Sequence, residues 1–105
     1  MGYKSSDWDL IWTVEAEKDV DAIYGFYEVI STEVALKIVT EIILEVEKIH
    51  FSEAFQVDDI NSNYRRIIVR HYKILYREDG NRIIIFAVFD SRQNPKKLRN
   101  LKRFQ

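Results

Sequence analysis

Residues 64–95 read Tyr-Arg-Arg-Ile-Ile-Val-Arg-His-Tyr-Lys-Ile-Leu-Tyr-Arg-Glu-Asp-Gly-Asn-Arg-Ile-Ile-Ile-Phe-Ala-Val-Phe-Asp-Ser-Arg-Gln-Asn-Pro. Runs of aliphatic and aromatic residues alternate here with short polar segments, which predicts three consecutive β-strands joined by tight turns. The turn at residues 78–81, Glu-Asp-Gly-Asn, has the composition that β-hairpins favour. Residues 83–88 are apolar at every position, as is typical of a central strand that is buried on both faces.

The first hairpin of this region predicts two different sheet faces. If Arg70 and His71 form a two-residue turn, Val69 pairs with Tyr72, and side chains alternate between the faces along each strand. One face is then a core face, made by Ile67, Val69, Tyr72, Ile74 and Tyr76. The other face is apolar at its centre and cationic around it, with Arg66, Ile68, Lys73, Leu75 and Arg77. A longer loop would shift the register by one residue and exchange the faces.

The residues before this region predict a short strand and a helical hairpin. Residues 8–13 alternate as a strand does, with Trp8, Leu10 and Trp12 on one face. Thr13 can cap a following helix, whose apolar stripe is formed by Ala16, Val20, Ile23, Tyr27 and Ile30. The pair Ser31-Thr32 breaks that pattern and begins a second helix over residues 33–49. The apolar stripe of this helix is formed by Ala35, Ile38, Val39, Ile42, Ile43, Val46 and Ile49. So short a connection predicts an antiparallel pair of helices, and residues 50–63 are interpreted as a connecting loop.

We therefore expect an α+β fold in the order β-α-α-β-β-β. An N-terminal strand precedes a helical hairpin, which packs on one face of a small, mainly antiparallel sheet. The 105 residues correspond to a single domain, whose core spans about residues 8–98. The C-terminal residues 96–105 are predicted to form a basic tail. The opposite face of the sheet is expected to serve as a binding surface.

Composition and charge narrow the classes of function. The chain has no cysteine and two histidines, so we expect neither a metal site nor a cofactor. No apolar run reaches the length of a membrane span and no signal peptide is evident, which favours a soluble cytoplasmic protein. Residues 1–60 carry a net charge of −10 and residues 61–105 a net charge of +9. This asymmetry indicates either a polyanionic or acidic partner for the basic half, or two halves that neutralise each other.

Cations on the outer sheet face are the main candidates for a site. Arg66, Lys73 and Arg77 lie on this face, Arg70 lies at its rim, and Arg92 follows the last strand. An arginine fork fits phosphate or carboxylate, so these residues could converge on a phosphate backbone or an acidic protein. The alternative is a solvated strand face on which cations prevent edge-to-edge aggregation.

Other residues have two interpretations each. Histidine side chains ordinarily titrate near neutral pH, so His71 is a candidate general acid or base, or simply a polar turn residue. Tyr72 and Tyr76 face the core in the predicted register, although tyrosines on a strand can also stack on bases.

The carboxylate pairs at residues 58–59 and 78–79 lack the histidine or third carboxylate that a metal site needs. The sequence contains neither a glycine-rich phosphate loop nor a nucleophile elbow.

Several motifs occur together along the chain. They are Ala16 at an acidic helix start; Tyr27 and Ser31-Thr32 before Ala35; Tyr64-Arg65-Arg66-Ile67; Tyr72-Lys73-Ile74-Leu75-Tyr76; and Val88-Phe89-Asp90-Ser91-Arg92-Gln93-Asn94-Pro95-Lys96-Lys97-Leu98. Over roughly residues 8–98 this pattern resembles the RelE/ParE superfamily of toxins from bacterial type II toxin–antitoxin systems, also known as plasmid stabilisation proteins. The tyrosine strand and the Arg-Gln-Asn-Pro ending carry most of the resemblance.

The resemblance implies one of two activities. RelE-like members are metal-independent endonucleases that cut mRNA on the ribosome, whereas ParE-like members poison DNA gyrase. By position, Lys73 and Arg92 match catalytic cations of the nucleases, and Arg65 or Arg66 lies near their lysines. The tyrosine or histidine that the nucleases carry near the C-terminus is replaced by Leu98 at about that place.

The sequence therefore predicts a growth-inhibiting toxin, with gyrase poisoning favoured and ribosome-dependent mRNA cleavage as the alternative. A third alternative is a decayed toxin that only binds its antitoxin. Lys73 and Arg92 would be catalytic in a nuclease, whereas target or phosphate binding would use Arg65, Arg66, Arg70 and Arg77. We expect Ile68 and Leu75 to contact an acidic antitoxin segment. A homodimer or a toxin–antitoxin hetero-oligomer is compatible with this prediction.

Overall fold

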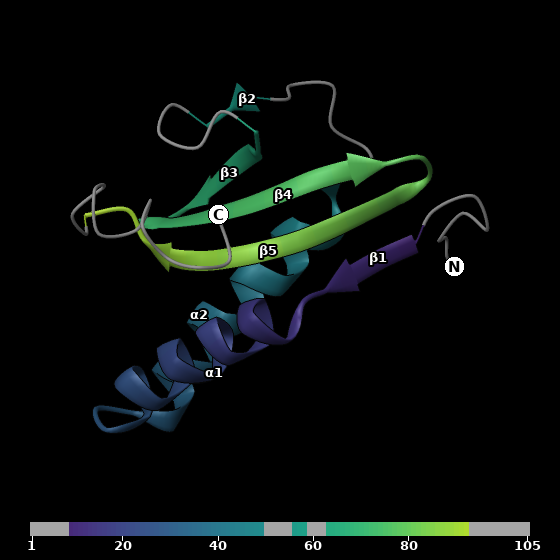
Figure 1. Ribbon diagram of the computed structural model, residues 1–105. Helices are drawn as coiled ribbons and strands as arrows, with labels where there is room; N and C mark the ends of the chain where they lie inside the picture. The colour runs from purple at the N-terminus through teal and green to yellow at the C-terminus, as the bar shows by residue number, and fades with distance from the viewer. Residues whose placement is uncertain (1–8, 50–55, 59–62, 93–105) are drawn as a thin grey trace.

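The computed structural model describes residues 9–49, 56–58 and 63–92 (Figure 1). Two helices pack beneath one face of a single sheet, and the sheet lies as a layer above them. The elements are β1 (Asp9–Trp12), α1 (Val14–Glu28), α2 (Thr32–Glu47), β2 (Gln56–Val57), β3 (Arg65–Val69), β4 (Tyr72–Asp79) and β5 (Arg82–Asp90). The predicted α+β layout is confirmed.

The sheet has five strands in the order β1-β5-β4-β3-β2. β2, β3, β4 and β5 pair antiparallel, whereas β1 pairs parallel with β5, so the sheet is mixed. The first strand of the chain therefore lies beside the last one, and the helical hairpin connects β1 to the rest of the sheet. None of the helices in the described part of the chain is long and apolar enough to cross a membrane.

The predicted two-residue turn at Arg70 and His71 is confirmed by the register. Val69 lies opposite Tyr72, and the pairing continues along the two strands as predicted. Arg70 has a φ of 57°, a left-handed conformation that a side chain other than glycine rarely adopts. Its guanidinium binds the Glu41 carboxylate of α2 at 2.7 Å and 3.0 Å, which fastens the strained turn to the helical layer. At the other hairpin, Gly80 has a φ of 63°, where glycine is favoured.

An irregularity in β5 decides which of its apolar residues face the helices. Leu75 pairs with Ala87 but the next residue, Tyr76, pairs with Ile85, so Phe86 is an extra residue in β5. This β-bulge turns both Phe86 and Ala87 toward the outer face, where they pack with Leu75. It keeps Ile85 and Val88 in the core on the helical side.

The main core lies between the sheet and the two helices. Ala16 of α1, Ile42 of α2, and Ile74 and Ile85 of the sheet are completely buried there. Leu10 and Trp12 of β1 pack against this core, as the alternation of the first strand predicts. Burial of such side chains contributes about 1.5–3 kcal/mol each, so this layer supplies most of the stabilisation of the fold.

The outer face of the sheet has a smaller core of its own. Tyr64, Leu75 and Ala87 are buried there, and Phe86 and Phe89 pack against them. The sequence predicts that this face is an open surface with an apolar centre. The structure corrects that expectation, because Leu75 is completely buried.

Three further features of the structure differ from the prediction made from the sequence. Within the predicted loop, Gln56 and Val57 form the two-residue strand β2, too short to give a periodic pattern. Ile30 was expected on the apolar stripe of the first helix but is 71% exposed, because α1 ends before it. Ile43 of α2 is more exposed than the predicted stripe implied. Trp8 and the predicted basic tail lie outside the described residues.

Thr13 couples the first helix to the sheet. Its Oγ1 accepts a hydrogen bond from the Ala16 backbone N–H at 3.1 Å and donates one to the Ile85 carbonyl at 3.0 Å. We predict that Thr13→Ala lowers the free energy of unfolding by about 2 kcal/mol, because both bonds are lost. Ser31→Ala removes the hydrogen bond of 3.3 Å from the Val34 backbone N–H to Ser31 Oγ, which caps α2. This change should lower the free energy of unfolding by about 1 kcal/mol or less. Urea denaturation measures both, and equal losses would contradict the coupling.

Candidate functional site: paired cations on the sheet

Lys73 does not point into solvent from the outer face. Its side chain is 6% exposed, and its ammonium lies 2.7 Å from the carboxylate of Asp58, which is also buried. The Arg66 guanidinium lies 3.8 Å from the same carboxylate. Asp58 follows β2, and its backbone N–H donates to the Tyr64 carbonyl, which holds the carboxylate over the sheet. Two of the predicted phosphate-binding cations are therefore held by one internal acid.

The remaining basic candidates on the sheet also have partners. Arg65 forms an ion pair with Glu78 across β3 and β4 at 3.0 Å. Arg70 binds Glu41, and its guanidinium lowers the pKa of that carboxyl. The exposed Arg77 lies over the rings of Tyr64 and Phe86, 5.8 Å and 6.0 Å from their centroids. The structure therefore gives each of these cations a different partner and does not gather them at one point.

The two residues predicted to contact an antitoxin differ in accessibility. Ile68 on β3 is 50% exposed and is available to a partner. Leu75 is completely buried in the outer core, so it can support such a surface but offers no contact area of its own.

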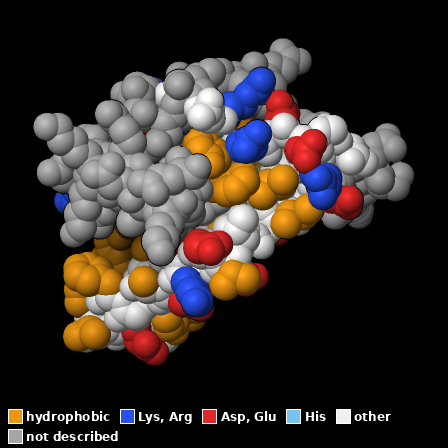
Figure 2. Space-filling model, viewed as in Figure 1, with side chains coloured by type: hydrophobic (Ala, Val, Ile, Leu, Met, Phe, Trp, Pro, Cys, Tyr) orange, Lys and Arg blue, Asp and Glu red, His pale blue; other side chains and the backbone are white. Residues whose placement is uncertain are grey.

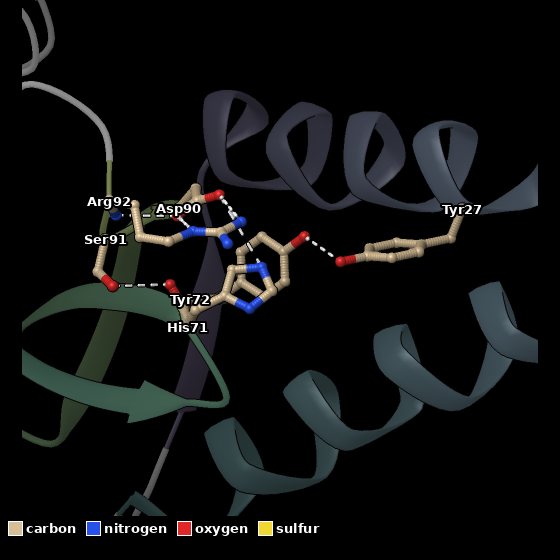
Figure 3. Close-up of polar contacts among 6 residues, drawn as sticks. All are labelled: Tyr27, His71, Tyr72, Asp90, Ser91 and Arg92. Carbon is tan, nitrogen blue, oxygen red and sulfur yellow. Dashed lines mark hydrogen bonds and ion pairs between the residues drawn. The ribbon is translucent and has the colours of Figure 1, made fainter.

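A second group of polar residues gathers at the end of the sheet that includes the Arg70–His71 turn (Figure 3). The Arg92 guanidinium binds the Asp90 carboxylate through two hydrogen bonds, of 2.9 Å from Nε and 2.6 Å from Nη2. The Arg92 backbone N–H adds a third, of 2.8 Å, to the same carboxylate. The other partner of Asp90 is His71, whose Nε2 lies 3.9 Å from Oδ2.

Two tyrosines extend this cluster toward the helices. The Tyr72 hydroxyl donates to the Tyr27 hydroxyl of α1 at 3.2 Å, and the His71 ring lies 4.3 Å from the Tyr72 ring (Figure 3). Burial and the bond to Tyr27 raise the pKa of Tyr72, so it stays protonated at neutral pH. Burial also raises the pKa of Tyr76, which packs in the main core as its predicted face requires. The positions of both tyrosines are thus those of core residues.

The acidic partners of Lys73 and Arg92 were not predicted from the sequence. Asp58 stood in a predicted loop, and no local pattern linked it to Lys73, fifteen positions later in the chain. Asp90 could have been found, because an aspartate two residues before an arginine after a strand can fold back on it. The role of Tyr27 depends on how α1 lies across the sheet, which periodicity does not give.

The helical layer carries a shallow groove and an apolar end. Trp12, Glu17, Val20, Asp21 and Ile43 line the groove, which has a volume of about 440 Å³. Figure 2 shows hydrophobic side chains at the end of the helical hairpin, where Phe26, Val29 and Ile30 are exposed. Among residues 9–49, 56–58 and 63–92, no group of three potential metal ligands comes together.

Comparisons with known proteins agree with this fold. The family of ParE toxins of type II toxin–antitoxin systems (parDE) matches over residues 10–95. A solved structure of the chromosomal ParDE toxin–antitoxin system from P. aeruginosa is similar, with 28% identity and a TM-score of 0.71. The match covers 82% of this chain and 98% of the other. No curated protein matches the sequence significantly. The chain belongs to the ParE toxin family and is the toxin component of a type II toxin–antitoxin system.

The buried ion pair makes a prediction about stability. We expect Lys73→Met to lower the free energy of unfolding by about 3 kcal/mol, because it leaves the buried Asp58 carboxylate without its closest counter-charge. Arg77→Met is the matched control on the same strand face and should cost about 1 kcal/mol or less. Guanidinium denaturation measures both losses. Equal, small losses would mean that the Lys73 ammonium is solvated.

The Asp90–Arg92 pair makes a prediction about pH. The Arg92 guanidinium lowers the pKa of Asp90 to about 2. Since this pKa lies below the ordinary aspartate value of about 3.9, the pair stabilises the fold above about pH 4 and loses that effect as the pH falls toward 2. Carboxyl ¹³C NMR should give this low pKa in the native protein and a higher one in Arg92→Ala. An ordinary aspartate pKa in both proteins would contradict the pair.

Proposed function

We propose that this toxin inhibits growth by poisoning DNA gyrase in the cytoplasm. The observation that carries the proposal is the buried Lys73–Asp58 pair. A ribonuclease without a metal needs cations that meet the scissile phosphate and stabilise its developing charge. Lys73 matches such a position by sequence, yet its ammonium is paired with the Asp58 carboxylate and removed from solvent. This supports a toxin that acts by binding a protein target.

We further propose that a cognate antitoxin neutralises the toxin by covering part of the sheet and its rim. The exposed Ile68 offers an apolar contact, and Arg77, held over two aromatic rings, offers a charge further along the same face of the sheet. An antitoxin segment with carboxylates and apolar side chains would suit both features. Such binding would make a toxin–antitoxin hetero-oligomer the resting form.

One observation favours mRNA cleavage as a second candidate. His71 lies beside Asp90, whose carboxylate binds Arg92, so an imidazole and an exposed guanidinium share one end of the sheet. An imidazole could there replace the proton carrier that is missing at Leu98. Arg92 would first have to leave Asp90 to reach a phosphate, and for that reason this function stands second.

The test compares purified toxin in two reactions. We predict loss of gyrase supercoiling, with accumulation of gyrase–DNA cleavage products, and no cutting of mRNA on programmed ribosomes. Codon-positioned cuts would overturn the proposal.

If such cuts appear, His71→Ala and Arg92→Ala should each lower the cleavage rate about 10²–10⁴-fold. Arg82→Ala is the matched control, because Arg82 is an exposed arginine paired with Asp79 at the opposite end of the same hairpin. Inactivity in both reactions, with intact binding to the antitoxin, would favour a decayed toxin.

A further inference from the structure

We propose that Asp90 is a positioning residue that holds Arg92 as an anchor for one carboxylate of the antitoxin. The inference rests on the antitoxin binding proposed above and is independent of the target of the toxin. It gives Asp90 a role that the sequence did not predict, and it narrows the role of Arg92, which the sequence predicts only in general terms as a contact for phosphate or an acidic protein, or as a catalytic cation in a nuclease.

The geometry of the pair leaves half of the guanidinium for a partner. Nε and Nη2 of Arg92 donate to Asp90 side-on. A guanidinium has five N–H groups in one plane, so the Nη1 group and the outer N–H of Nη2 point away from Asp90. This second edge fits a carboxylate through two parallel hydrogen bonds. The Arg92 side chain is 70% exposed, so the edge is within reach of a bound protein.

Neighbouring contacts fix the pair in place. The Arg92 backbone N–H binds Asp90, and both the Ser91 backbone N–H and the Ser91 hydroxyl donate to the His71 carbonyl at 2.8 Å (Figure 3). The turn after β5 is thereby tied to the turn before β4. A long arginine side chain that is already ordered loses less conformational entropy when a partner binds.

Among the described residues, the charges at this end of the sheet favour a protein carboxylate over a nucleic-acid phosphate. Asp90 cancels the charge of Arg92, and Glu41 cancels that of Arg70, which precedes His71 in the turn. Such paired charges attract a polyanion weakly, whereas a single carboxylate is recognised by its hydrogen bonds. Phe26, which is 66% exposed and packs edge-on against Tyr27, offers an apolar contact beside the same cluster. Both features suit an amphipathic acidic segment of the antitoxin.

The experiment is a set of calorimetric titrations of the full-length toxin with its cognate antitoxin. We expect Arg92→Ala to weaken binding about 10- to 100-fold, as for a lost charge-assisted bidentate contact. Asp90→Ala should weaken binding about 5- to 10-fold, because the guanidinium is then free to turn away. The double variant should bind no more weakly than Arg92→Ala, because Asp90 acts through Arg92. Arg92→Lys keeps the charge but loses the fork, so it should follow Arg92→Ala.

The matched controls are Asp79→Ala and Arg82→Ala, an exposed pair at the other end of the β4–β5 hairpin, which should leave the affinity unchanged. The proposal is overturned if Asp90→Ala binds as tightly as the native toxin or more tightly, since Asp90 would then not position Arg92. It is also overturned if Arg92→Ala keeps native affinity, whatever the activity of the toxin. If the native toxin cuts mRNA and this variant does not, Arg92 would instead be assigned to phosphate. Gyrase assays on the same proteins report separately on the proposed target.

Discussion

The fold depends on the register that the Arg70–His71 turn imposes on β3 and β4. Because opposed residues share a face of the sheet, a shift of one residue would put Lys73 on the same face as Ile67 and Val69. Either Lys73 would then enter the main core, or Ile67 and Val69 would leave it. The Arg70–Glu41 ion pair holds this turn in a left-handed conformation that its sequence does not favour. The β-bulge at Phe86 extends the same separation of faces to β5. Arg65, Arg66, Lys73 and Arg77 lie on the faces to which this register assigns them.

The separation of the two sheet faces decides whether a cation on the outer face can bind a phosphate. A cation on the outer face would serve a phosphate only if it were solvated or shared with a ligand, and the buried Asp58 carboxylate engages Lys73 instead. At the rim, Asp90 engages Arg92 but leaves it exposed. The two pairs therefore differ in kind, since the first buries both of its charges and the second leaves its guanidinium exposed to a partner. The family match shows that the chain is a ParE toxin. The two ion pairs are the features from which we infer whether it binds a phosphate or a protein.

Much of the fold could be predicted from sequence because it follows from periodicity and turn chemistry. The Val69–Tyr72 pairing, the Thr13 cap and the Gly80 hairpin each depend on a few adjacent residues. The site was less predictable, because its pairs join residues far apart in the chain. Lys73 was expected on an open cationic face, and no local pattern predicted that Asp58 would cover it. The bulge at Phe86 was also hidden, since an entirely apolar strand shows no alternation that a bulge could interrupt.

The toxin holds Lys73, which best matches a catalytic cation of the nucleases by position, in an internal ion pair. Timed acetylation of lysines in the native protein, read by mass spectrometry, measures whether this ammonium is accessible to solvent. Lys73 should react much more slowly than the exposed Lys37 and Lys48, and should reach their rates when the protein is unfolded. If Lys73 is acetylated as fast as those two lysines in the folded protein, its ammonium is open to solvent and the case against a nuclease fails.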